Sequence, residues 1–274
     1  MNITFLLLPA LLLLSCQPRP DNPAEYRGGA LVNIESIPVP AGFTRIDYAS
    51  HSYSHWLRQI HIRKDNRVLL YNGRPSNDQS SHFAVLDLPI GNKDLQQCAD
   101  AAMRLRADYF LSRNLPDSIR FKSTSGQLLS FTHWRSGTRY QLSGNKLVAY
   151  STSPSSLDPR SDLLNFLEFA FQFCGTLSLQ RDLHPLADLQ QMVPGDVFVK
   201  GGSPGHAMTI VDMATNDKGQ KIFLLSQGFM PAQDIHIVRN PSDPAGDPWY
   251  SIDDIEYELV TPGWTFTKQQ LYRW

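Results

Sequence analysis

Residues 194–214 read PGDVFVKGGSPGHAMTIVDMA, and this stretch decides the fold. Two apolar runs, 197–200 and 207–213, have the composition of short β-strands and enclose a glycine-rich loop. The loop presents one histidine, His206, where the second run begins. An imidazole held at the edge of a β-scaffold suits a general base, and the same pattern also fits a solvent-facing histidine beside a tight loop. Both interpretations of His206 remain open at this point.

The next apolar run, 222–225, predicts a partner strand that is joined to the first through the turn residues 216–219. If the hairpin closes symmetrically about residues 216 and 217, His206 lies opposite Gln227. An amide at that position would bind one imidazole nitrogen and so fix the tautomer of the ring. A register slip of one residue would instead turn Gln227 to the other face of the sheet.

Two helices are expected before this hairpin. Asp94 followed by Gln97 matches a capping box, and an apolar face then continues to about residue 113, formed by Leu95, Cys98, Ala102, Leu105 and Tyr109. Residues 161–174 form a second candidate helix that is apolar on nearly all sides. Residues 57–62 and 68–71 alternate like a β-hairpin. These patterns predict a single α+β domain, with an antiparallel sheet packed against the cysteine-bearing helix and a second buried helix.

Cys98 lies in the first turn of the first expected helix. Helix N-terminal N–H groups stabilise a thiolate, so Cys98 is a candidate nucleophile and Gln97 a candidate for binding an oxyanion. Cys98 also shares the apolar face of its helix, which fits a buried structural thiol. A third interpretation is a disulfide with Cys174, because two cysteines of an exported protein commonly form a disulfide, and the N-terminus, described below, predicts export.

The remaining candidates concern substrate and metal. Gly202 and Ser203 of the glycine-rich loop, together with Trp249 and Tyr250, are assigned to a substrate-binding rim, although loop aromatics also serve as plugs over a core. Ser203 fits the G-x-S-x-G pattern, but a strand follows it where a nucleophile elbow needs a helix. The histidine and cysteine spacings match no zinc motif, so we expect neither a metal nor another cofactor.

The N-terminus predicts export and an anchor. Residues 1–15 resemble a signal peptide, whose apolar run of about ten residues is too short to span a bilayer. The run ends in Leu13-Leu14-Ser15-Cys16, which resembles the lipobox at which bacterial lipoproteins are cleaved and acylated on the cysteine. A plain signal peptide that happens to contain Cys16 is the alternative. Proline and glycine in residues 16–40 predict a flexible tether, and residues 41–274 the globular domain.

The charge of the chain and its expected location limit the classes of molecule that it can bind. With 25 basic and 26 acidic residues and no basic cluster, the chain lacks the electrostatic footprint of nucleic-acid binding. We expect one partner to be the lipid bilayer, through acylated Cys16, and the other to be a molecule of the envelope. The expected location is the bacterial envelope, at the outer rather than the inner membrane.

Three segments carry a family resemblance: 94–100 (DLQQCAD), 201–206 (GGSPGH) and 230–233 (MPAQ). They resemble a family of bacterial lipoproteins defined by domain of unknown function 4846, and the likeness extends over nearly the whole mature chain. This family brings no activity with it.

More distantly, the order Cys98, Gly195-Asp196, His206 and Gln227 is similar to that of the papain-like NlpC/P60 and CHAP amidases, which cleave amide bonds in cell-wall peptides. The resemblance implies a papain-like core with Cys98 as nucleophile, His206 as base and Gln227 as orienting residue. It also implies that the envelope partner is a cell-wall peptide. Because about a hundred residues separate Cys98 from His206, an insertion carrying the second helix is required. The alternative is a non-catalytic anchored domain that binds a peptide, a glycan or an envelope protein through the same cleft.

Overall fold

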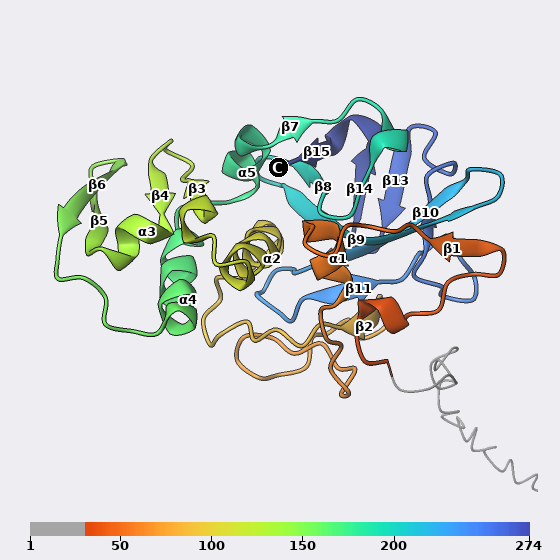
Figure 1. The fold of residues 1–274 in the computed structure, drawn as a ribbon, viewed down its shortest axis with the longest axis horizontal. Helices are drawn as coiled ribbons and strands as arrows, with labels where there is room; N and C mark the ends of the chain where they lie inside the picture. The colour runs from red at the N-terminus through yellow and green to blue at the C-terminus, as the bar shows by residue number, and fades with distance from the viewer. Residues whose placement is uncertain (1–30) are drawn as a thin grey trace, which may run out of the picture.

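The strand that begins at His206 lies at the centre of the main sheet. In the computed structural model, which describes residues 31–274, β9 (His206–Asn216) pairs with β8 (Val197–Lys200) on one side and β10 (Lys221–Gln227) on the other. The sheet is antiparallel and runs in the order β2-β11-β10-β9-β8-β15-β7 (Figure 1). Its outer strands are β2 (His82–Val85), β11 (His236–Val238), β15 (Leu271–Arg273) and β7 (His184–Pro185), and β1 (Phe43–Arg45) and β12 (Tyr250–Ser251) pair with β9 and β10.

Both faces of this sheet are covered, which explains why β9 is buried from His206 to Ala214. Helices α1 (Tyr53–Arg58) and α2 (Cys98–Ser112) pack on one face, where Ala207 and Val211 of β9 belong to apolar clusters that include α2 side chains. The opposite face packs against the hairpin of β13 (Glu258–Thr261) and β14 (Trp264–Thr267), with Met208 and Ile210 in the shared cluster.

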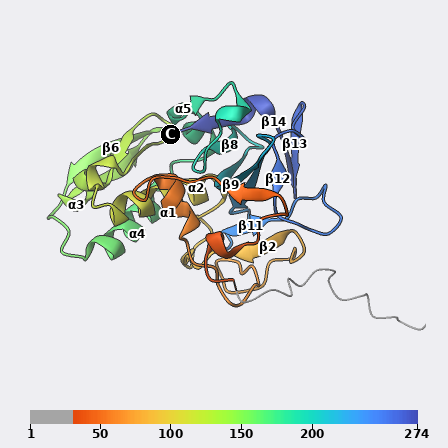
Figure 2. The same cartoon turned by 45° about the vertical axis from the view of Figure 1, so that its right-hand side comes forward.

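The chain that follows α2 in the sequence forms a lobe, which lies on the left side of Figure 1 and of the turned view in Figure 2, with α2 between it and the main sheet in Figure 1. It contains the hairpins β3 (Arg120–Lys122)–β4 (Leu128–Ser130) and β5 (Thr138–Ser143)–β6 (Lys146–Ser151), and the helices α3 (Phe131–Arg135) and α4 (Pro159–Ala170). The second expected helix is therefore present as α4, but it ends at Ala170, and α5 (Thr176–Asp182) follows as a separate helix. Short 3-10 turns lie at Ile34–Ser36, Pro116–Ser118, Leu189–Gln191 and Lys268–Gln270.

The hairpin expected from residues 57–62 and 68–71 is wrong. Residues 53–58 form α1, because the Ser52 hydroxyl accepts the His55 N–H at 3.1 Å and caps a helical turn. Tyr53 and Leu57, four residues apart, then face the core together. Two apolar residues four positions apart share a face in a helix as well as in a strand, so this spacing alone does not distinguish the two.

The folded region begins earlier than the expected boundary at residue 41. Ile34 and Ile37 are fully buried, although both were placed in the tether. Arg45 fixes this segment, because its guanidinium donates to the Ile37 carbonyl at 2.5 Å and forms an ion pair with buried Asp212 of β9 at 2.7 Å. The expected signal peptide and Cys16, with most of the expected tether, lie outside the described residues. Among the helices of residues 31–274, none has both the length and the apolarity to cross a membrane. With its antiparallel sheet and the helices packed against it, the structure is a single domain of the α+β class.

Candidate active site

A cavity of about 520 Å³ lies where the start of α2 meets the glycine-rich loop and the start of α5. Five of the residues predicted to act in catalysis or substrate binding line it: Gln97, Cys98, Gly202, Ser203 and His206. They come from segments more than one hundred residues apart, so the fold brings the helix start and the loop together. Concave sites of this size that mix apolar walls with a few polar groups are typical of ligand binding.

Cys98 is the first residue of α2, not the fourth after its cap. Gln97 occupies the cap position, and its N–H donates to the Asp100 carboxylate at 3.0 Å. Asp94, the expected cap, instead accepts the N–H of Ala232 at 2.6 Å. The first N–H groups of a helix have no partner within the helix, so this position places Cys98 beside free backbone donors.

The Cys98 thiol is protonated at rest, because it is only 8% exposed and burial opposes its ionisation. Burial, followed by the charge of Asp100, raises the pKa of Cys98 from 9 to about 11, while the N–H groups of Ala207, Ala99 and Cys98 itself act in the opposite direction. Cys174 lines the same cavity, and burial raises the pKa of its thiol to about 12. Both thiols are free, so the expected disulfide alternative is wrong for this structure.

His206 is enclosed by aromatic rings rather than facing solvent, and the solvent-facing interpretation is wrong. Phe229, Trp264 and Phe266 lie with ring centroids 5.3, 5.4 and 5.9 Å from the imidazole, which is 3% exposed. This burial lowers the pKa of His206 from 6.5 to about 4, against the opposing effect of its hydrogen bond to Gln227. The imidazole is neutral at pH 7 and so has a lone pair available for a proton.

Gln227 binds His206, with 2.7 Å between Gln227 Oε1 and His206 Nε2, but the register differs from the expected one. The hairpin first pairs three residues out of the symmetrical register, for example Lys221 with Thr215. A bulge between Leu224 and Leu225 then absorbs one residue, leaving a shift of two. Because side chains alternate with a period of two, an even shift keeps Gln227 on the face of His206. Gln227 lies behind the imidazole and lines a second cavity of about 310 Å³.

The glycine-rich loop is fixed to α5, which holds His206 at the start of its strand. The Gly201 N–H donates to Gln180 Oε1 at 2.7 Å, and the Thr176 hydroxyl donates to the Gly202 carbonyl at 3.1 Å. A Cβ at Gly205 would lie 2.4 Å from Thr176 Oγ1, so only glycine fits this close approach.

Trp249 and Tyr250 do not reach the cavity. Trp249 is 5% exposed, and its indole N–H donates to the Pro38 carbonyl at 2.7 Å. Tyr250 is 3% exposed and donates to the Arg239 carbonyl at 2.6 Å. Both are core residues next to β10, whereas the aromatic side chains that line the cavity are Phe171, Phe229 and Trp264.

Sequence reasoning missed Asp100 as a functional candidate. It is 5% exposed and lines the cavity; one carboxyl oxygen binds Gln97, and the other, Oδ1, has no partner. Burial raises the pKa of Asp100 to about 8, so at pH 7 it is mostly a neutral acid that can donate a hydrogen bond to a ligand. The signal was a single charged residue within the otherwise apolar run Cys98–Met103.

Within residues 31–274, no three histidine, cysteine, aspartate or glutamate side chains are grouped so that they could hold a metal ion. Comparison with curated proteins and with solved structures gives no match. The family model for domain of unknown function 4846 matches residues 34–273, which is nearly all of the described chain. The chain therefore belongs to the family defined by domain of unknown function 4846.

Proposed function

We propose that this domain is a papain-like cysteine hydrolase that cleaves an amide bond in cell-wall peptides, carried by an envelope lipoprotein anchored through Cys16. One observation carries the proposal. Cys98, at the start of α2, and His206, at the start of β9, line one cavity, and Gln227 binds the imidazole from behind at 2.7 Å. A nucleophilic hydrolase needs a nucleophile, a base and an orienting group, and these three side chains would supply them.

The proposed reaction has two steps. As Cys98 Sγ attacks the substrate carbonyl carbon, its proton passes to His206 Nδ1, and the oxyanion is met by N–H groups at the start of α2 and by the Gln97 amide. The proton then passes from His206 to the leaving amine as the C–N bond breaks, which leaves a thioester on Cys98. Water, deprotonated by His206, hydrolyses the thioester and restores the thiol.

The resting protonation states constrain this mechanism. The pKa values of about 11 for Cys98 and about 4 for His206 mean that the thiol and the imidazole, which line the same cavity, are both neutral at pH 7. A thiolate–imidazolium pair formed in advance would need the proton to move against this difference. We therefore infer that proton transfer accompanies the attack on the carbonyl, with substrate in place.

A neutral Cys98 thiol and a neutral His206 imidazole also favour the second candidate, a non-catalytic domain that binds a peptide, a glycan or an envelope protein in the cavity. A protonated Asp100 with one unpartnered oxygen offers a hydrogen-bond donor, and Phe229 and Trp264 offer apolar rings for contact. In this function the thiol contributes packing alone, so replacing its sulfur would leave binding unchanged.

Turnover of purified muropeptides separates the two candidates. Release of new amino groups, followed by mass spectrometry, is expected for the wild type and is expected to disappear in Cys98→Ser. Cys174→Ser is the matched control, since it removes a thiol of the same cavity that has no neighbouring base in the proposal. Absence of turnover by the wild type, or equal turnover by Cys98→Ser, contradicts the hydrolase.

The anchor is tested separately. Mass spectrometry of the mature N-terminus is expected to show acyl groups on Cys16, and Cys16→Ala is expected to move the protein out of the membrane fraction. An unmodified N-terminus in the wild type contradicts the anchor and leaves the hydrolase proposal standing.

A further inference from the structure

Gln227 is held on both sides by histidines. Its Oε1 lies 2.7 Å from His206 Nε2, and its Nε2 lies 3.2 Å from the Nε2 of His236 in β11. All three side chains are buried, with exposed fractions of 3 to 4%. A buried amide between two rings has only two orientations, which differ by exchange of its oxygen and its nitrogen. The orientation that Gln227 adopts decides which nitrogen of His206 carries the proton.

His236 determines that orientation, because its own tautomer is fixed by the backbone. His236 Nδ1 lies 2.9 Å from the carbonyl oxygen of Asp234, which can only accept, so Nδ1 must carry a proton. Burial lowers the pKa of His236 to about 4, and the ring is neutral at pH 7. Its Nε2 is then bare and accepts an N–H from Gln227.

The consequence reaches the proposed base. With the Gln227 nitrogen turned toward His236, the amide oxygen faces His206 and accepts a hydrogen bond from the N–H at His206 Nε2. His206 Nδ1 is thereby left without a proton, as a base requires. An apolar residue in place of His236 would remove this selection, because either amide orientation would then be available to Gln227.

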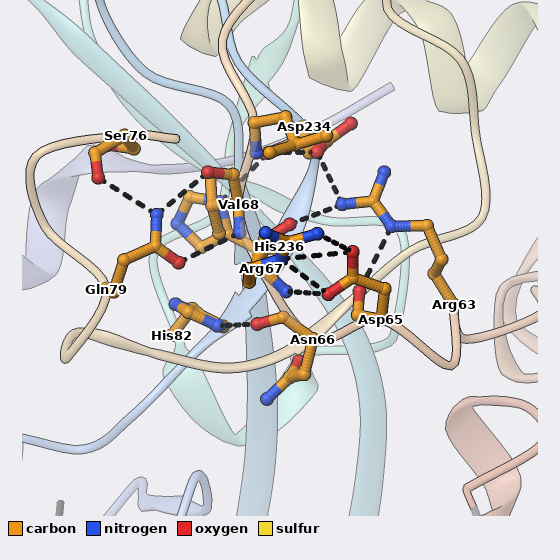
Figure 3. Close-up of polar contacts among 11 residues, drawn as sticks. Arg63, Asp65, Asn66, Arg67, Val68, Ser76, Gln79, His82, Asp234 and His236 are labelled. Carbon is orange, nitrogen blue, oxygen red and sulfur yellow. Dashed lines mark hydrogen bonds and ion pairs between the residues drawn. The ribbon is translucent and has the colours of Figure 1, made fainter. Parts of the chain in front are cut away.

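Asp234 is itself held firmly, which gives the chain of hydrogen bonds a fixed end. Its carboxylate accepts from the Arg63 guanidinium at 2.6 Å and from the Leu69 N–H at 2.8 Å, as the close-up in Figure 3 shows for Arg63. The Asp234 N–H in turn donates to the Leu69 carbonyl at 2.9 Å. The carbonyl that fixes His236 therefore belongs to a residue locked to the loop around residues 63–69.

We propose that His236 is a positioning residue of this site, acting through Gln227 to keep the His206 proton on Nε2 and the lone pair on Nδ1. The inference rests on the proposed function for its catalytic meaning. Its structural content, the tautomer of each ring, holds whether or not the domain is a hydrolase.

Nitrogen-15 NMR of the full-length protein tests the tautomers directly, since protonated and bare imidazole nitrogens differ widely in chemical shift. The wild type is expected to show His236 protonated on Nδ1 and His206 on Nε2. The opposite tautomer at either ring overturns the proposal. This measurement needs no substrate, so failure to hydrolyse muropeptides would reject the hydrolase without affecting this result.

Substitutions test the coupling between the two histidines. His236→Met removes the acceptor and is expected to give a mixture of His206 tautomers and to lower kcat by about 3- to 10-fold at unchanged KM, the worth of one net hydrogen bond. His236→Gln should restore both, because its amide can donate to the Asp234 carbonyl and accept from Gln227. An unchanged His206 spectrum in His236→Met overturns the proposal, and if that variant does not fold, the wild-type spectrum decides.

His82→Phe is the matched control. His82 is a second buried histidine, with its ring centroid 6.1 Å from that of His236, and its Nε2 bonds to the Asn66 carbonyl rather than to Gln227. Removing it perturbs the same region without breaking the chain that ends at His206. We expect the His206 spectrum to be unchanged, and a tautomer mixture in this variant would overturn the specific role of His236.

Discussion

The ionisation of Cys98 gives the sharpest prediction about the site. A cysteine protease with a preformed thiolate–imidazolium pair reacts with alkylating agents at a rate that is constant across neutral pH. Here the thiol pKa is raised from 9 to about 11. Because only the thiolate reacts, alkylation by iodoacetamide should rise about tenfold for each pH unit from 6 to about 7.5, with no plateau. The rise should be less steep near pH 8, where the ionisation of Asp100 opposes that of the thiol.

The size of the effect follows from the same shift. An increase of two units lowers the thiolate fraction about 100-fold relative to an ordinary cysteine at any pH well below 9. The assay measures the rate at the Cys98 peptide by mass spectrometry, in the folded protein and in denaturant. Limited access to a side chain that is 8% exposed lowers the folded-state rate further at every pH, so the slope with pH isolates ionisation.

Asp100→Asn provides a second readout with a defined sign. The Asp100 charge is the second-largest contribution that raises the pKa of Cys98, and the pKa of Asp100 itself is raised to about 8. The substitution should therefore speed alkylation above pH 8, where Asp100 is ionised, and leave it unchanged at pH 6. A rate plateau between pH 5 and pH 8 in the wild type refutes the reasoning, because it would reveal a thiolate that already exists at rest.

Three further predictions concern stability and the loop, each checked by urea or thermal unfolding. Gly205→Ala should lower the free energy of unfolding by about 1–3 kcal/mol by overpacking. Gly175→Ala, which has open space around its Cβ, should lower it less, because it only weakens the N-cap of α5. Asp212→Asn should lower the free energy of unfolding by about 3–5 kcal/mol, because it leaves the guanidinium groups of Arg45 and Arg58 without their ion pair. Asp65→Asn, in the exposed ion pair with Arg67, should cause no measurable change. Lowering the pH from 6.5 to 4 should reduce the free energy of unfolding of the wild type by about 2–3 kcal/mol more than that of His236→Phe. The reason is that His236 gains a proton in the unfolded chain, whereas the buried ring, with a pKa of about 4, is still largely unprotonated until pH 4 is reached.

Local patterns were enough to predict the strands that carry the site and the pairing of His206 with Gln227. Val197–Lys200 is observed with the expected bounds, and β9 and β10 extend the expected apolar runs by a few residues. These strands are buried on both faces, so they are continuously apolar and can be identified from the sequence. The His206–Gln227 contact is confirmed, although the register behind it was wrong.

The features that sequence reasoning missed depend on contacts between distant residues. Asp94 looked like a helix cap, but its carboxylate is used by Ala232, which lies 138 residues away in the sequence. The bulge between Leu224 and Leu225 has no marker in the local sequence, and without it Gln227 would face away from His206. His236 looked like one residue of a short strand, and its bond to Gln227 appears only when β11 pairs with β10.

The central claim is that Cys98 and His206 act as one nucleophile–base pair, and a double-mutant cycle on muropeptide hydrolysis tests it most directly. Each of Cys98→Ser and His206→Ala is expected to lower kcat/KM by at least about 10³, and the double variant by no more than the larger single loss, because groups that act as a unit are not additive. Losses that add, or hydrolysis that survives Cys98→Ser, would contradict the account.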